Sequence, residues 1–203
     1  MEMKNIDLLE TAGYLYYPKL LSSEINDIPP QNDDGSPKLG SMIYRSYKGK
    51  SKCSYSEELW FPNSTIIVNE QIYKSLSNKI CDTLRSTFEL DLLPTFHYSA
   101  FYYRDCSYEH SSMSPGKEIT VSIQIKSISN INWKYVLSLT DYSDVMFTMR
   151  DGDALIYKGD SIFARRPVLE LNDENKDKYH HQLYFHYVNS QGNNVHYANR
   201  FCL

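Results

Sequence analysis

The chain has 203 residues and a net charge of −4, and its lysines and arginines form no dense block. This composition suits one compact domain, does not favour electrostatic binding of nucleic acid, and contains no run of the roughly 18 apolar residues that a membrane span needs. The segment Met1–Leu9 alternates charged and apolar residues and lacks the apolar stretch of a secretory signal, which favours a cytoplasmic protein.

The N-terminal part of the chain predicts short elements separated by loops. Gly13–Pro18 (GYLYYP) is typical of a short strand, and Ser22 or Ser23 is a suitable cap for a short helical segment after it. Residues 28–40 are rich in Pro, Asp, Asn and Gly, which is typical of a loop. Residues 41–62 mix aromatic residues with Ser and Lys, so we expect an irregular hairpin or a flap over a site.

Asn69–Phe88 carries the clearest helical pattern. Its apolar stripe consists of Ile72, Leu76, Ile80, Leu84 and Phe88, widened by Tyr73 and Cys81. Asn69 is the expected N-cap, and Glu70 complements the positive end of the helix. Pro94 prevents the helix from continuing.

After Pro94 the apolar period changes from that of a helix to that of a strand. The predicted strands are Thr95–Tyr103, Glu118–Ile125, Tyr135–Thr140, Val145–Met149, Ala154–Tyr157 and Gln182–Val188. Turn sequences rich in Gly, Pro and Asp separate several of them. Successive strands without helices between them favour an antiparallel sandwich or barrel. Neither an internal repeat nor a linker is apparent, so residues 1–203 are predicted to form a single domain.

Cysteine and tyrosine usage adds two expectations. None of the four cysteines forms a Cys-x-x-Cys pair, so a zinc site or a redox pair is not indicated. Cys81 falls on the apolar side of the predicted helix and is expected in the core. Disulfide pairing stays open, although a cytoplasmic location argues against it. The 18 tyrosines favour a β protein whose sheet surfaces use an apolar ring with a polar tip.

Several ordered segments of the second half resemble one family. They are Leu93–Tyr98 (LPTFHY), continuing to His110, Glu118–Ile123 (EITVSI), Asp151–Gly159 (DGDALIYKG), Arg166-Pro167 and Gln182–Val188 (QLYFHYV). This order is similar to the prolyl-hydroxylase type of iron(II)/2-oxoglutarate oxygenases, including small phage and bacterial members. The resemblance implies a mainly β fold with packed helices, a double-stranded β-helix of the jelly-roll or cupin kind. Its core would span about residues 93–190, with residues 1–92 packed on it.

The resemblance also locates an iron site, and that site is altered. Oxygenases of this family hold iron(II) with two histidines and one carboxylate, which leave open positions for 2-oxoglutarate and oxygen. His110 stands at the first ligand position, but Ser112 stands at the carboxylate position and Ala164 at the distal histidine position. A neutral hydroxyl is a poor iron ligand and a methyl group is none. The resemblance therefore predicts a degenerate metal site, although halogenases tolerate a small residue at the carboxylate position.

Other side chains are candidates for the missing ligands. Strand alternation places His180 and His186 on one face and His181 on the other. His180 and His186 would lie about 20 Å apart, so these two cannot share one metal. His186 matches a structural His-Tyr-Val ending of the family. Glu109 adjoins His110 but points away from it in an extended strand. A shifted loop that brings His180 to His110 remains an alternative.

The resemblance further implies a 2-oxoglutarate pocket. Arg166 matches the arginine that grips the distal carboxylate, Tyr102 matches an assisting strand tyrosine, and Arg165 is a further candidate. The alternative is that both arginines are surface residues that end a strand.

Three functions are consistent with these residues. The leading hypothesis is a repurposed or non-catalytic member that binds a small acidic ligand, a peptide or a protein through the old pocket. The alternative is an active oxygenase with an atypical ligand set that includes His110, which would use iron(II) and 2-oxoglutarate to hydroxylate, or less readily halogenate, a peptide or small metabolite. A third is an interaction module that presents a Tyr-rich face. Homo-oligomer formation stays open.

Overall fold

The structure is a computed structural model that describes residues 5–21, 43–45, 63–68, 73–110 and 114–198. One group of strands consists of β1 (Tyr14–Tyr17), β2 (Ile43–Arg45), β3 (Ser64–Val68), β4 (Leu92–Tyr102), β6 (Ile119–Lys126), β9 (Ala154–Lys158) and β11 (His180–Asn189). The second group consists of β5 (Tyr108–His110), β7 (Tyr135–Ser138), β8 (Asp144–Phe147) and β10 (Phe163–Arg166). The first group forms a seven-stranded sheet in the order β1-β9-β6-β11-β4-β3-β2, and the second forms a four-stranded sheet in the order β5-β10-β7-β8.

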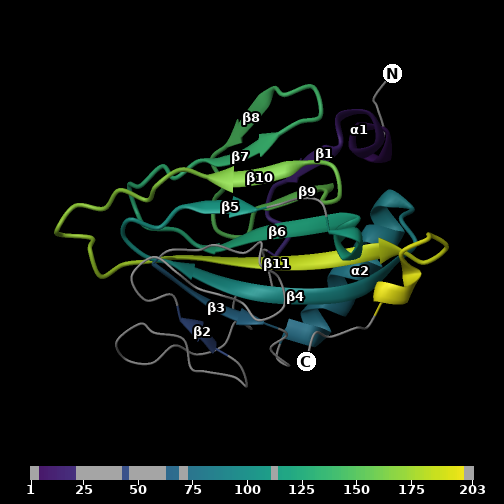
Figure 1. The fold of residues 1–203 in the computed structure, drawn as a ribbon, viewed down its shortest axis with the longest axis horizontal. Coiled ribbons are helices and arrows are strands. Elements are labelled where there is room, and N and C mark those ends of the chain that lie inside the picture. Colours follow the sequence, from purple (N-terminus) through teal and green to yellow (C-terminus); the bar gives the residue numbers. More distant parts are fainter. Residues whose placement is uncertain (1–4, 22–42, 46–62, 69–72, 111–113, 199–203) are drawn as a thin grey trace.

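The two sheets form the double-stranded β-helix that the sequence predicts, with all described strand pairs antiparallel (Figure 1). The predicted strands after Pro94 are confirmed as β4, β6, β7, β8, β9 and β11. The short strands β3, β5 and β10 and the helix α1 (Asn5–Ala12) were not predicted. Strands of three to five residues are too short to establish a period, so their pairing partners must define them.

The helix α2 (Lys74–Phe88) packs against the outer face of the seven-stranded sheet. Its buried side chains, among them Ile80, Leu84 and Phe88, share a hydrophobic cluster with Val121, Leu183 and Phe185 of the sheet. The helix ends where Glu89 adopts a left-handed conformation. The described α-helix begins at Lys74, whereas the predicted helix began at Asn69. Residues 69–72, with the predicted cap, lie outside the described residues.

Pro94 lies inside a strand, which the sequence did not predict. The strand β4 starts at Leu92, and its pairing with β11 shifts register between Phe185, opposite His97, and Tyr187, opposite Pro94. A bulge is one of the few places where a sheet accepts proline, because the ladder is already interrupted there. On the other side of β4, the described residues of β3 pair with β4 from Tyr102 to Tyr98. Pro94 therefore marks the bulge and not the boundary of the strand.

Tyrosine fills the space between the two sheets. The side chains of Tyr98, Tyr102, Tyr108, Tyr135, Tyr157 and Tyr184 are all buried in one inter-sheet cluster. The abundance of tyrosine thus reflects interior packing. Cys81 is buried as predicted, and both it and Cys106 are free thiols. Cys53 and Cys202 lie outside the described residues, as do the predicted cap at Ser22 or Ser23, the predicted 28–40 loop and most of segment 41–62.

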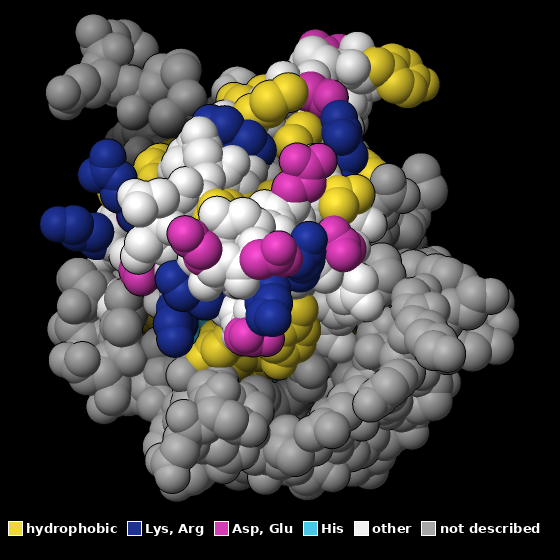
Figure 2. All heavy atoms as spheres, turned by 90° about the vertical axis from the view of Figure 1, so that its left-hand side faces the viewer, with side chains coloured by type: hydrophobic (Ala, Val, Ile, Leu, Met, Phe, Trp, Pro, Cys, Tyr) yellow, Lys and Arg dark blue, Asp and Glu magenta, His cyan; other side chains and the backbone are white. Residues whose placement is uncertain are grey.

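The described surface carries charges of both signs. Of the helices that the structure describes, none is long and apolar enough to cross a membrane. Figure 2 shows acidic and basic side chains interspersed over one face of the molecule. A mixture of signs creates a weaker field than a single-sign patch, so this face does not favour a polyanion.

Candidate functional site

The antiparallel pairing of β5 with β10 brings the two predicted ligand positions together. Ala164 is directly opposite His110 in the register. Residues opposite each other in such a pair have Cβ atoms about 4.5–5.5 Å apart. A metal-binding side chain at position 164 would therefore be close enough to bind the same metal ion as a side chain at position 110. The Ala164 methyl group is completely buried in the inter-sheet cluster, and Ser112 lies outside the described residues.

Arg166, two residues along β10, is a fully buried cation. Its Nη1 donates to the carbonyl oxygen of Trp133 at 2.7 Å, and its Nη2 lies 2.8 Å from Oε1 of both Gln124 and Gln182. The guanidinium carbon lies 4.4 Å from the centre of the Trp133 ring and 4.9 Å from that of Tyr135. Its Nε makes no hydrogen bond within the described part of the chain. Neutral acceptors and aromatic faces therefore surround the charge.

Tyr102 belongs to the same interior cluster as Arg166. Its hydroxyl lies 2.9 Å from that of Tyr184, and its ring meets the Trp133 ring edge-on at 5.2 Å. Burial, first of all, raises the pKa of both Tyr102 and Tyr184 well above the ordinary value, so both hydroxyls are neutral. Tyr102 and Arg166 thus both contact the ring of Trp133.

Arg165 points to the opposite side of β10 from Arg166. Its Nη2 lies 2.5 Å from Oδ2 of Asp144, on the outer part of the small sheet, and its side chain is 37% exposed. The structure therefore does not bring Arg165 together with Arg166 and Tyr102. Arg165 is thus a partly exposed residue, as the alternative interpretation expected of both arginines, whereas Arg166 is buried.

The histidines of β11 lie where strand alternation predicts. His180 packs against Trp133 with ring centres 5.1 Å apart, and neither of its nitrogens has a partner among the described residues. His186, also on the inner face, lies 3.0 Å through Nδ1 from the Thr120 hydroxyl. His181, on the other face, lies 2.8 Å through Nε2 from the Ser99 hydroxyl. The three histidines therefore contact different residues.

The described side chains around position 164 offer no metal site, whereas the side chain of His110 and residues 111–113 lie outside the description. Among residues whose side chains are described, no three His, Cys, Asp or Glu side chains gather closely enough to hold a metal ion. Ala164 belongs to the buried inter-sheet cluster that also contains Tyr108 and Tyr135, and its partner on β7 is Leu137. A methyl group among such neighbours supplies neither a lone pair nor a charge to a metal.

The buried histidines predict that the protein loses stability in mild acid. Burial, with a contribution from Arg166 for His180 and Lys126 for His181, lowers the pKa of each imidazole from 6.5 to about 3. Between these values the unfolded chain binds more protons than the folded chain, so the free energy of unfolding falls as pH falls. We expect a loss of about 2 kcal/mol per imidazole between pH 6.5 and pH 5.

Urea unfolding at pH 7 and pH 5 measures this loss. The double variant His180→Gln/His181→Gln should show a much shallower pH dependence than the unmodified protein. An equally steep dependence in the variant would assign the acid sensitivity to other groups.

Comparisons with known proteins identify the fold. No protein-family model and no curated protein sequence matches the chain. A prolyl-4-hydroxylase from Pseudomonas putida is similar with a TM-score of 0.60 and 10% identity, covering 91% of this chain and 97% of that chain. A Trichoplax adhaerens prolyl hydroxylase, solved in complex with a hypoxia inducible factor peptide fragment, has a TM-score of 0.58 and 13% identity, covering 92% of this chain and 88% of that one.

A third similar structure is HygX from Streptomyces hygroscopicus with nickel, 2-oxoglutarate and hygromycin B bound. Its TM-score is 0.57 at 13% identity, with 94% of this chain and 88% of that chain covered. At these identities the likeness shows the fold. The predicted prolyl-hydroxylase-like fold of the 2-oxoglutarate oxygenases, a double-stranded β-helix, is thus confirmed.

Proposed function

We propose that this protein keeps the 2-oxoglutarate oxygenase fold without iron(II)/2-oxoglutarate turnover and acts as a non-catalytic binding protein. The observation that carries the proposal is the pairing of Ala164 with His110. The position that could supply a second ligand beside residue 110 holds a buried methyl group. With Ser112 at the carboxylate position in the sequence, at most one residue of the expected triad can bind a metal.

The state of Arg166 supports the same proposal. An arginine that grips a cofactor carboxylate needs two free N–H groups aimed at an open space. In Arg166 both Nη atoms already donate to oxygens of the chain itself, those of Trp133, Gln124 and Gln182. Only Nε lacks a protein acceptor among the described residues. A carboxylate that approached Nη2 would therefore have to displace the acceptors that are already in place.

The filled interior also bears on the class of partner. The similar structures include one solved with a peptide fragment and one with 2-oxoglutarate and hygromycin B. In this chain, tyrosine rings and Arg166 occupy the space between the sheets. A peptide or protein that binds outside this space is therefore favoured over a small acid that binds within it.

Anaerobic titration with iron(II) and 2-oxoglutarate tests the proposal. A ferrous 2-oxoglutarate complex produces a visible charge-transfer absorption band, and the Pseudomonas putida prolyl-4-hydroxylase serves as the positive control. We expect no band from this protein and no conversion of 2-oxoglutarate to succinate when oxygen is admitted. A band together with succinate production at enzyme-like rates would overturn the proposal.

A further inference from the structure

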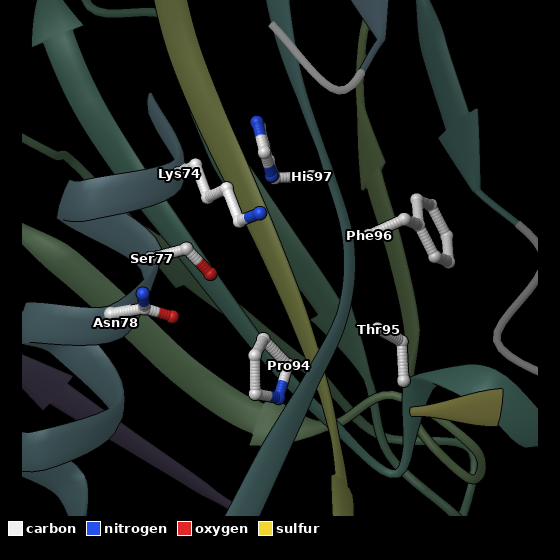
Figure 3. A pocket seen from close by; sticks show the side chains of 7 residues that line it. All are labelled: Lys74, Ser77, Asn78, Pro94, Thr95, Phe96 and His97. Carbon is white, nitrogen blue, oxygen red and sulfur yellow. The ribbon is translucent and has the colours of Figure 1, made fainter. Parts of the chain in front are cut away.

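The described helices pack on the larger of the two sheets. Helix α1 contacts β1 and β9, and α2 contacts β4. Figure 3 shows the side chains of Lys74, Ser77 and Asn78 of α2 directed toward residues 94–97 of β4. The cavity between them has a volume of only about 90 Å³, so α2 lies close against the strand. The four-stranded sheet differs, because its last strand, β8, lies at the outer edge of the molecule (Figure 1).

The strand β8 has backbone hydrogen-bonding groups along its free edge. Among the described strands, its one neighbour is β7, with which it pairs in antiparallel register. The Leu139 N–H donates to the Ser143 carbonyl oxygen at 2.8 Å, so the backbone of Ser143 faces β7. The facing alternates along a strand of an antiparallel pair. The N–H and C=O groups of Asp144 and Met146 therefore face away from β7, where another strand could pair with them.

The hairpin of β7 and β8 also exposes two large apolar side chains. Met146 is 61% exposed, and Tyr142, at the hairpin tip, is 97% exposed. The φ angle of Tyr142 is +66°, at a position of the hairpin loop where glycine causes less strain than tyrosine. An almost fully exposed ring contributes little to folding, and here its backbone is strained as well. Strain of this kind gathers at functional positions, so Tyr142 indicates a contact with another molecule.

The free edge of β8 is complementary to a second copy of itself. If two copies meet in antiparallel order about a twofold axis at Val145, Asp144 of each copy lies opposite Met146 of the other. The outward-facing N–H and C=O groups of both residues then form hydrogen bonds across the axis. The Asp144 carboxylates are kept apart, because each lies opposite a methionine.

The charges at the two ends of the hairpin match in the same arrangement. Asp141 lies at the exposed tip, whereas Arg150 and Lys134 lie at the other end, with Lys134 Nζ 2.6 Å from the Thr148 hydroxyl. The antiparallel order brings the tip of one copy beside residues 148–150 of the other. Asp141 therefore approaches two cations of the second copy, and Tyr142 reaches the same end. An unrelated strand would pair with the backbone of β8 but would not supply these charges, so a second copy is favoured.

We infer that the protein forms a homodimer in which β8 pairs with β8 of a second copy and joins the two four-stranded sheets into one continuous sheet. Two short strands bury less surface than a standard protein interface, so the dimer should dissociate on dilution with a Kd on the order of micromolar. The pairing lies outside the space between the two sheets of each copy. This inference is therefore independent of the function proposed for the fold.

Sedimentation equilibrium of the full chain, over a range of about 1 μM to 1 mM, tests the inference. We expect a monomer–dimer equilibrium. Met146→Pro removes an outward N–H from each copy, a change that an edge strand tolerates, and should weaken dimerisation about a hundredfold. Val168→Asn is the matched control, because Val168 is a 51% exposed apolar residue outside the hairpin. It should change the Kd by about twofold or less.

The Tyr142→Gly variant separates dimerisation from folding. Glycine adopts a positive φ without strain, so the melting temperature of the dilute monomer should be unchanged or raised. The dimer should nevertheless be about tenfold weaker, because the aromatic contact is lost. These opposite effects keep the test decisive even if Met146→Pro reduces folding.

Charge reversal tests the antiparallel arrangement. Asp141→Lys alone and Arg150→Glu alone should each weaken dimerisation about tenfold, and the double variant should recover most of the loss. A chain that stays monomeric at every concentration would overturn the inference. So would a dimer whose Kd is unchanged in both Met146→Pro and Tyr142→Gly, or single charge variants that weaken the dimer without recovery in the double variant.

Discussion

Replacing Arg166 with methionine is expected to lower the free energy of unfolding by about 3–5 kcal/mol. Methionine roughly preserves the apolar length of the side chain but removes every donor. The oxygens of Trp133, Gln124 and Gln182 that now accept from Arg166 would lose that bond in a buried setting. The contacts of the guanidinium with two aromatic rings would also disappear. Urea denaturation followed by tryptophan fluorescence measures the change.

Arg165→Met is the matched control for this experiment. Its ion pair with Asp144 is partly exposed, and such pairs contribute about 1 kcal/mol or less. The two neighbouring arginines should therefore differ clearly in the cost of the same substitution. Equal costs, or a stable Arg166→Met variant, would mean that Arg166 faces an open pocket and not a packed interior. That outcome would also remove one support of the proposed loss of 2-oxoglutarate binding.

Gly159→Ala is expected to lower the free energy of unfolding by about 3 kcal/mol, at the upper end for overpacking. A Cβ atom at this position would lie 2.3 Å from the Thr120 hydroxyl oxygen and 2.4 Å from the backbone oxygen of Lys117. The backbone cannot easily move away, because the Gly159 N–H donates to the Glu118 carbonyl oxygen at 3.1 Å. Thermal and urea unfolding of the variant give the size of the effect.

Gly116→Ala provides the comparison for Gly159→Ala. A Cβ atom there would have its nearest contact at 3.5 Å, with the Tyr197 ring, which is ordinary van der Waals distance. We expect a change within about 1 kcal/mol, typical of a substitution without a clash. If Gly159→Ala and Gly116→Ala lowered the free energy of unfolding equally, Gly159 would not lie as close to Thr120 and Lys117 as the structure places it.

Much of the fold was predictable from the sequence because its longer elements have clear periods. The stripe that includes Ile80, Leu84 and Phe88 defined α2, and alternation defined β6 and β11. The strand β3 and the bulge at Pro94 were not predictable, since they depend on partners distant in the chain.

The sequence suggested residues for the candidate site, whose role stays a prediction, but it did not indicate their surroundings. Family resemblance pointed to residues 110 and 164, and the strand register places them opposite each other. The packing of Arg166 depends on Gln124 and Gln182, which lie on two other strands. No local pattern connects residues so far apart in the chain. The sequence did not distinguish Arg165 from Arg166, and only the structure shows which of them is interior.

The iron(II) content of the purified protein tests the loss of the metal site most directly. The protein is incubated anaerobically with excess iron(II), freed of unbound metal by gel filtration, and analysed by plasma mass spectrometry beside the His110→Ala variant. We expect far less than one iron per chain, with no difference between the two proteins. About one iron per chain that His110→Ala removes would contradict the account, because it would mean that an atypical set of ligands still completes the site.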